Sequence, residues 1–242
     1  MNVVTAPAPS RTWPMALRVT LALGFRATCY AVMLWMALLA EARPAPRLPD
    51  LVLAHVPYVP WVDRWNYALW TLAYLPVALL LLKEDASRFC RYTVASGVLA
   101  LLRGLCILAT GLGPVNGADV NAGMDAASRM RAFFQLVSPV DVLGANTPHT
   151  YLTKDLFFSG HTATTFLLLL YVWRFQGLRA VMLMGHVLVV ASVFLSHLHY
   201  TIDVIGAYAI TFTVFSLFEG NPRALLAGEP VPDGGVSRAR AS

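Results

Sequence analysis

The stretch RAVMLMGHVLVVASVFLSHLHYTIDVIGAYAITFTVFSLF, residues 179–218, decides the fold, because two long apolar runs meet at a short polar segment. Each run approaches the ~20 residues that an α-helix needs to cross about 30 Å of hydrocarbon. We interpret the runs as two membrane spans, at 179–196 and 200–218. The segment between them, SHLHYTID at 196–203, carries titratable groups, which are costly at a membrane and therefore indicate function.

Four further apolar runs have a similar length, at 20–40, 65–83, 92–112 and 158–174. The chain is 57% hydrophobic and only 13% charged, which is typical of a polytopic membrane protein. The sequence therefore predicts an all-α protein with a six-helix transmembrane catalytic domain at 20–218. An N-terminal segment, 1–19, would contain an interfacial helix at 11–19, and the Pro/Gly/Arg-rich residues 219–242 would be a disordered tail.

The positions of lysine and arginine predict the orientation in the membrane. These residues are more frequent in the segments that lie inside when both termini are cytoplasmic. The same bias accounts for the net charge of +5 without nucleic acid as a partner. The long loops 41–64 and 113–157 would then lie outside, and SRMRAFFQLV, residues 128–137, is amphipathic enough to lie on the outer membrane surface.

A histidine and an aspartate at the start of the last span are the first candidates for chemistry. His199 and Asp203 are four residues apart, which on a helix places both side chains on one face. A carboxylate that accepts the Nδ1 proton of an imidazole fixes its tautomer and leaves Nε2 as a basic nucleophile. We therefore expect a nucleophilic His199 oriented by Asp203.

The segment FSGHT, residues 158–162, indicates a phosphate site at the start of the fourth span. Ser159 is a plausible N-cap, Gly160 would let a ligand approach the backbone, and His161 lies in the first helical turn. The N-terminus of a helix attracts anions through its free N–H groups and its dipole. Arg103, in the outer half of the span 92–112, could add a bidentate contact to phosphate oxygens.

Other polar residues favour structural roles. We expect His186 to bond a neighbouring helix and Arg26 to extend to the inner membrane surface. His197 and the histidine two positions later could bind a metal, but no HExxH or carboxylate-rich cluster accompanies them, so we expect no metal and no cofactor. The three cysteines lack a CxxC spacing and are interpreted as small buried hydrophobes. Two loop histidines receive no role, His55 and His149.

Several of these motifs carry a family resemblance. FSGHT followed by HYTIDVIGAY, residues 199–208, resembles the paired signature of sphingomyelin synthases, which belong to the lipid phosphate phosphatase-like superfamily. PRLPD, residues 46–50, is similar to the family's Pro-Pro-Leu-Pro-Asp element. The segment from Arg103 to Pro114 and the spacing from Asp155 to His161 also match. The resemblance extends over residues 20–218.

The chain also departs from the family pattern. The family's usual Cys-Gly before the aspartate is Thr153-Lys154 here. The phosphatase pattern of a lysine, six residues and Arg-Pro is missing, and Val193 stands where phosphatases place an arginine. These differences favour the synthase branch over the phosphatase branch.

The resemblance implies a mechanism and its participants. His199 would attack the phosphorus of a glycerophospholipid such as phosphatidylcholine, Asp203 would orient His199, and His161 would protonate the departing diacylglycerol. His161 would then deprotonate ceramide, which accepts phosphocholine or phosphoethanolamine. The residues that would hold the phosphate group are Arg103, Ser159, Gly160, Tyr200 and Asp155.

Alternatives remain at this stage. The same site with water as the acceptor would be a lipid phosphate phosphatase or a phospholipase C-like hydrolase, and the fold could also serve a transporter or scaffold. Aromatic residues suit a choline headgroup, and the outer loops offer Tyr58, Trp61, Phe133 and Phe134. The excess of arginine over lysine is typical of GC-rich bacteria. We therefore expect a bacterial inner membrane with a periplasmic site, with a Golgi or plasma membrane as the alternative.

Overall fold

The structure is a computed structural model that describes residues 13–138 and 151–220. Within these residues it contains α-helices, one short 3-10 helix at Leu53–His55 and no strand, as the all-α prediction requires. The helices are α1 (Met15–Glu41), α2 (Pro60–Glu84), α3 (Ala86–Ala109), α4 (Ala126–Val137), α7 (Gly160–Val172), α8 (Gln176–Leu195) and α9 (Thr201–Glu219).

Five of the helices are long and apolar enough to cross a membrane: α1, α2, α3, α8 and α9. Their outward faces carry exposed apolar side chains such as Leu72 on α2 and Leu217 on α9, which are 71% and 78% exposed. The predicted fourth span is shorter than expected, because α7 has 13 residues and is about 20 Å long. The chain is therefore an integral membrane protein, and residues 13–138 and 151–220 contain five full-length candidate spans and one short apolar helix.

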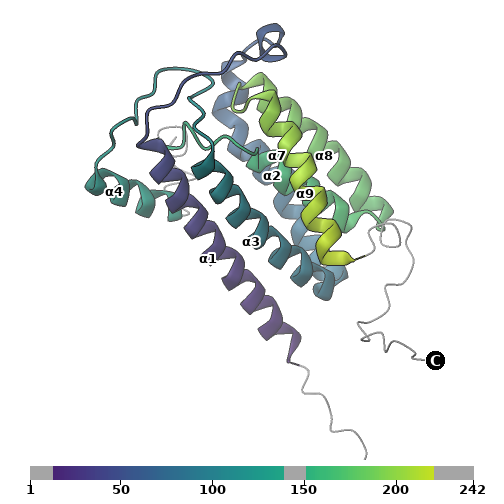
Figure 1. Ribbon diagram of the computed structural model, residues 1–242. Coiled ribbons are helices and arrows are strands. Elements are labelled where there is room, and N and C mark those ends of the chain that lie inside the picture. The colour runs from purple at the N-terminus through teal and green to yellow at the C-terminus, as the bar shows by residue number, and fades with distance from the viewer. Residues whose placement is uncertain (1–12, 139–150, 221–242) are drawn as a thin grey trace, which may run out of the picture.

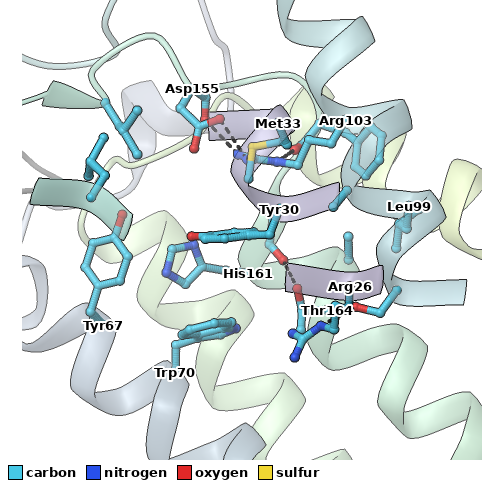
Figure 2. A pocket seen from close by; sticks show the side chains of 17 residues that line it. Arg26, Tyr30, Met33, Tyr67, Trp70, Leu99, Arg103, Asp155, His161 and Thr164 are labelled. Carbon is cyan, nitrogen blue, oxygen red and sulfur yellow. Dashed lines mark hydrogen bonds and ion pairs between the residues drawn. The ribbon is translucent and has the colours of Figure 1, made fainter. Parts of the chain in front are cut away.

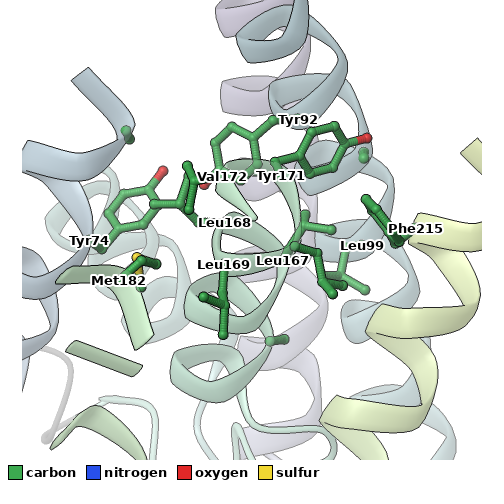
Figure 3. Close-up of a cluster of buried hydrophobic side chains, with 14 of the residues drawn as sticks. Tyr74, Tyr92, Leu99, Leu167, Leu168, Leu169, Tyr171, Val172, Met182 and Phe215 are labelled. Carbon is green, nitrogen blue, oxygen red and sulfur yellow. The ribbon is translucent and has the colours of Figure 1, made fainter. Parts of the chain in front are cut away.

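The short helix α7 lies at the centre of the bundle, where it packs against α2, α3, α8 and α9 (Figure 1). Its second half is apolar all round and fully enclosed, as a helix surrounded by other helices should be. Figure 3 shows Leu167, Leu168 and Tyr171 of α7 among Leu99 of α3 and Phe215 of α9. This packing fixes α7, and with it the residues at its N-terminus.

All the segments expected to carry chemistry lie at one end of the bundle. The helices alternate in direction, so the connecting segments 42–59, 110–125 and 151–159 lie at the same end as the start of α7 and the turn between α8 and α9 (Figure 1). This arrangement agrees with the predicted grouping of the motifs. The location of both termini in the cytoplasm stays a prediction.

Two glycines let α1 and α3 pack closely. A Cβ at Gly97 would lie 2.9 Å from Phe25 Cε1, and a Cβ at Gly104 would lie 2.7 Å from Met36 Sδ. Small residues on one helix face permit such close approach in membrane proteins. The contact brings Arg26 of α1 to Ser96 of α3, with Nε donating to Oγ at 3.1 Å. The prediction that Arg26 extends to the membrane surface is therefore wrong.

The ends of the chain and the second loop differ in part from the predictions. Helix α1 runs unbroken from Met15, so residues 15–19 are its first turns and not a separate interfacial helix. The amphipathic helix in the loop is present as α4, where Asp125 accepts the N–H of Ser128 at 2.7 Å and Phe134 is 64% exposed. Its contact with the membrane surface stays a prediction. His149 and the tail beyond residue 220 lie outside the described residues.

Candidate active site

Two histidines from different segments converge at the loop end of the bundle. His161 lies in the first turn of α7, and His199 lies in the turn between α8 and α9. Their ring centroids are 6.3 Å apart, with the ring planes inclined at 64°. The predicted convergence of these imidazoles is thus present, and their joint action on one phosphorus atom stays a prediction.

The carboxylate of Asp203 lies behind His199. His199 Nδ1 is 3.5 Å from Asp203 Oδ2, which also accepts the N–H of Tyr200 at 2.9 Å. The predicted pairing is present, but its geometry differs because α9 begins only at Thr201. His199 precedes the helix, and Asp203 folds back over the helix N-terminus, where free N–H groups favour a carboxylate. With Nδ1 facing Asp203, Nε2 is the nitrogen left for chemistry.

The turn that carries His199 is held in place by α2 and by the loop that precedes α2. Asn66 of α2 donates to Ser196 Oγ at 3.0 Å, and Asn66 is fully buried. His197 Nε2 lies 2.9 Å from the carbonyl oxygen of Val56. The His197 ring therefore contacts the loop before α2 and does not pair with His199. The described residues contain no cluster of three or more potential metal ligands.

Asp50 caps the helix that follows this turn. Its Oδ2 accepts the N–H of Thr201 at 2.6 Å, and its Oδ1 accepts the Thr201 hydroxyl at 2.9 Å and the N–H of Leu53 at 3.1 Å. Burial alone would raise the pKa of Asp50, but these hydrogen bonds outweigh it and lower the pKa below its ordinary value. The sequence offered Asp50 only as part of PRLPD, so its capping role was missed.

Tyr200 joins the two long loops. Its hydroxyl accepts the N–H of Leu48 at 3.1 Å and donates to the carbonyl of Gly113 at 3.0 Å, and the side chain is buried. A phosphate contact through this hydroxyl would have to replace one of these bonds. Tyr200 does not line the cavity described below, and its predicted contact with phosphate stays a prediction.

Arg103 is engaged with the segment that precedes His161 (Figure 2). Its Nε donates to the carbonyl of Phe158 at 2.7 Å, and its Nη2 donates to the carbonyl of Asp155 at 2.9 Å. Its Nη1 forms an ion pair with Asp155 Oδ1 at 2.7 Å. Each guanidinium nitrogen thus has a protein partner, but the two Nη atoms carry two N–H groups each and Arg103 lines the cavity described below, so its predicted phosphate contact stays a prediction.

Gly160 makes room for this arginine. A Cβ at Gly160 would lie 3.0 Å from Arg103 Cζ and 3.1 Å from its Nε. In the structure the group that lies close to Gly160 is this guanidinium, and the predicted approach of a ligand to the Gly160 backbone stays a prediction.

Ser159 is the N-cap of α7, as predicted. Its Oγ accepts the N–H of Thr162 at 3.4 Å. Its own N–H donates to the backbone carbonyl of Asp203 at 3.0 Å, which ties the start of α7 to α9. The side chain is fully buried and does not line the cavity, so its predicted contact with phosphate stays a prediction.

A cavity of about 140 Å³ opens beside His161, between α1, α2, α3 and α7. Arg103, Asp155 and Gly160 line it together with His161. His199 is buried beside this cavity and does not line it. Within the described residues, this cavity therefore reaches the pair of imidazoles from the His161 side.

Three aromatic residues at the cavity were missed by sequence reasoning. The rings of Tyr67 and Trp70 lie 5.2 and 5.5 Å from the ring of His161, and Tyr30 of α1 lies across the same cavity (Figure 2). They sit within apolar spans, where an aromatic residue has no distinguishing signal.

The aromatic residues that were predicted to bind choline do not line the cavity. Tyr58 donates to Asp63 Oδ2 at 2.8 Å, and Phe133 packs edge-on against Trp35 at 5.6 Å. The remaining two, Trp61 and Phe134, are exposed. The structure therefore does not support this part of the prediction.

The unusual pair Thr153-Lys154 belongs to a buried polar cluster. Glu41 at the end of α1 accepts the Thr153 hydroxyl at 2.8 Å and also the backbone N–H of Lys154. Lys154 Nζ forms an ion pair with Asp119 Oδ1 at 2.6 Å. These contacts anchor the segment that leads to Asp155, so the departure from the family pattern has a structural explanation.

His186 links three helices, as expected. Its Nδ1 lies 2.8 Å from Thr165 Oγ1 on α7, and its Nε2 lies 2.8 Å from the Tyr208 hydroxyl on α9. The Thr165 hydroxyl in turn donates to the backbone carbonyl of His161 at 2.8 Å. The first turn of α7 is therefore connected to α8 and α9 by hydrogen bonds.

Comparisons with known proteins agree with the resemblance in the motifs. Residues 154–220, which include His161, His199 and Asp203, match the PAP2 superfamily C-terminal family. The chain is 27% identical over 240 aligned residues to phosphatidylcholine:ceramide cholinephosphotransferase 1 of pig (Sus scrofa), rat (Rattus norvegicus) and mouse (Mus musculus). Each alignment covers 89% of this chain and 55% of the relative, so the chain spans about half the length of these relatives. The predicted resemblance is thereby confirmed: the chain is similar to ceramide cholinephosphotransferases along most of its length, and its segment 154–220 matches the PAP2 superfamily.

Proposed function

We propose that this protein is a lipid headgroup phosphotransferase. It moves phosphocholine or phosphoethanolamine from a glycerophospholipid to ceramide and releases diacylglycerol. The observation that carries the proposal is the pair of imidazoles at 6.3 Å, of which His199 has a buried carboxylate behind it. The names of the relatives, which are phosphatidylcholine:ceramide cholinephosphotransferases, support the same reaction class.

The first half of the reaction forms a phosphohistidine. Nε2 of His199 attacks the phosphorus, and the bond from phosphorus to the glycerol oxygen breaks. His161, as the imidazolium, gives its proton to that oxygen, so diacylglycerol leaves as a neutral alcohol. Asp203 stabilises the positive charge that develops on His199, because a buried carboxylate acts strongly on a nearby cation.

The second half regenerates the enzyme. The neutral His161 takes the proton from the primary hydroxyl of ceramide, and the resulting oxygen nucleophile attacks the phosphorus. The phosphorus–nitrogen bond breaks, His199 recovers its electron pair, and His161 is again protonated. The transferred group thus moves in two displacements, each with a good nucleophile.

The surrounding residues position this chemistry. Arg103 fixes the segment before α7 through the carbonyls of Asp155 and Phe158, and so places His161. We assign the non-bridging phosphate oxygens to the backbone N–H groups at Gly160 and His161, because the first turn of a helix favours an anion.

The cavity lining suits an ammonium headgroup. The ring of Tyr67 and the carboxylate of Asp155, which also pairs with Arg103, face the part of the cavity away from Arg26. Aromatic faces attract quaternary ammonium groups, and a carboxylate attracts any ammonium. We therefore expect a choline or ethanolamine headgroup here, with the aromatic faces favouring choline.

An assay with labelled lipid tests the proposal. Purified protein receives phosphatidylcholine labelled in the headgroup, with and without ceramide, and the lipid products are separated. We expect a labelled sphingolipid that requires both ceramide and His199, whereas a His55→Ala variant, changed in an exposed loop, should retain activity. Release of the label into water regardless of ceramide would instead identify a hydrolase, and full activity of His199→Ala would refute the mechanism.

We further infer a bacterial inner membrane from the excess of arginine over lysine in the sequence. The positions of the two residue types along the chain favour an active site that faces the periplasm. A membrane-impermeant thiol reagent applied to intact cells tests the side. It should label a Val120→Cys variant at the loop end of the bundle but not a Glu84→Cys variant at the other end. The reverse pattern would contradict the inferred orientation.

A further inference from the structure

Arg26 is a charged side chain in the middle of a membrane-spanning helix. It lies close to the midpoint of α1, and its guanidinium turns inward to α3. A charged group at this depth is costly and generally marks a functional position. None of the catalytic steps described above uses Arg26.

The neighbours of Arg26 do not neutralise its charge. Its Nε donates to Ser96 Oγ at 3.1 Å, and its Cζ lies 5.6 Å from the ring centroid of Tyr74. No Asp or Glu within residues 13–138 and 151–220 forms an ion pair with it. This differs from Arg103, whose charge is balanced by Asp155 at 2.7 Å.

Arg26 faces the same cavity as His161, at the end remote from Asp155 (Figure 2). Tyr30 lies one helical turn further along α1, between the level of Arg26 and that of Arg103. Four residues of helix correspond to about 6 Å along the axis. The cavity therefore places a cation roughly one helical turn deeper in the bundle than the ring of Tyr30.

We propose that Arg26 binds the ester carbonyl oxygens of the donor glycerophospholipid. This inference rests on the proposed function, because it places the phospho-headgroup at His161. In such a lipid the ester carbonyls lie a few covalent bonds from phosphorus, toward the hydrocarbon, which is the direction from His161 to Arg26. A guanidinium can donate several charge-assisted hydrogen bonds to these oxygens.

The test compares two donors with one headgroup. One is diester phosphatidylcholine, and the other is its dialkyl ether analogue, which lacks the carbonyl oxygens. We expect the wild-type protein to use the diester about 10- to 100-fold better in kcat/KM, the range that hydrogen bonds to a charged group provide. An Arg26→Met variant should lose this preference through a higher KM for the diester, while its turnover of the ether lipid stays close to that of the wild-type protein.

Arg18→Met is the matched control, because it removes the same charge from an exposed position two turns earlier on α1. It should keep the preference for the diester. Equal use of both lipids by the wild-type protein would overturn the proposal, even if Arg26→Met did not fold. An unchanged preference in a folded Arg26→Met would also overturn it.

A binding measurement separates this inference from the proposed function. Each lipid is added to the purified protein, and the shift in Tm is recorded without any turnover. A larger shift for the diester in the wild-type protein, absent in Arg26→Met, supports the carbonyl site even if no transfer to ceramide is found. Equal shifts for both lipids in both proteins would contradict it.

Discussion

Replacement of Gly160 by alanine provides the sharpest test of how the site is built. The new Cβ would lie 3.0 Å from Arg103 Cζ and 3.1 Å from Nε, whereas ordinary van der Waals contacts are 3.4–4 Å. Either the guanidinium or the first turn of α7 must therefore retreat by a few tenths of an ångström. Both carry part of the site, because Arg103 holds the preceding segment and the α7 turn bears His161.

The expected cost follows from the contacts that would be lost. A retreat of Arg103 would lengthen its hydrogen bonds to Phe158 and Asp155, now 2.7 and 2.9 Å, toward the upper limit of the favourable range. Hydrogen bonds to a charged group contribute about 1.5–3 kcal/mol each, and overpacking costs about 1–3 kcal/mol. A shift of α7 would misplace His161, and a misplacement of about 1 Å can cost roughly 100-fold in rate. Because the required shift is only a few tenths of an ångström, we expect kcat to fall about 3- to 10-fold in Gly160→Ala.

Gly177→Ala is the matched control for this experiment. Gly177 also lies in the first turn of a helix, α8, but a Cβ there would meet nothing within 4 Å. Alanine is favoured over glycine in a helix by about 0.5–1 kcal/mol, so this variant should be slightly more stable and fully active. Headgroup transfer and Tm are measured for both variants. Activity in Gly160→Ala equal to that in Gly177→Ala would show that the Arg103 contact does not position the site.

Three further predictions concern other parts of the site. Asp203→Asn should lower kcat by about 10²–10⁴-fold and reduce the phosphohistidine trapped with donor lipid alone, while normal trapping would remove Asp203 from the first step. His186→Leu should lower the free energy of unfolding by about 1–3 kcal/mol, because Thr165 and Tyr208 lose a buried partner; an unchanged Tm would contradict this. Asp50 has a lowered pKa, so its stabilisation is present above its ordinary pKa of about 4 and is lost as the pH falls through the lower value in the folded protein. The difference in Tm between the wild-type protein and Asp50→Ala should therefore narrow below about pH 4, and a constant difference would show that the charge of Asp50 does not contribute.

The sequence predicted the fold well where the signal was hydrophobic length. The apolar runs are helices in the structure, and the amphipathic pattern before residue 138 is α4. The length of the apolar run overestimated α7, because the run at 158–174 includes the turn before Gln176. A helix enclosed by other helices also does not have to span the hydrocarbon by itself. The separate interfacial helix failed because nothing in the sequence ends a helix between Met15 and the first span.

The candidate site was predictable where a motif placed chemistry at the end of an element. The pairing of His199 with Asp203 and the capping role of Ser159 follow from local spacing, and both are present. The aromatic lining was not predictable, because Tyr67 and Trp70 lie in an apolar span and acquire their role only from the packing of α2 against α7. Local spacing determines contacts within a few residues, whereas contacts between helices depend on packing.

The two arginines within the spans show most clearly what spacing leaves undetermined. The cost of a charge in hydrocarbon indicates that Arg26 and Arg103 each have a reason to be there, but it does not identify the partner. The structure balances the charge of Arg103 with Asp155, and it leaves Arg26 facing the cavity with neutral neighbours. Arg103 therefore positions the segment before α7, whereas we propose Arg26, which the sequence suggested as a surface anchor, as the cation that binds the lipid esters. If the comparison of diester and ether donors supports this assignment, different elements carry the two functions. Helix α1 selects the ester-linked glycerol of the donor, whereas α7 and the α8–α9 turn carry the chemistry at phosphorus.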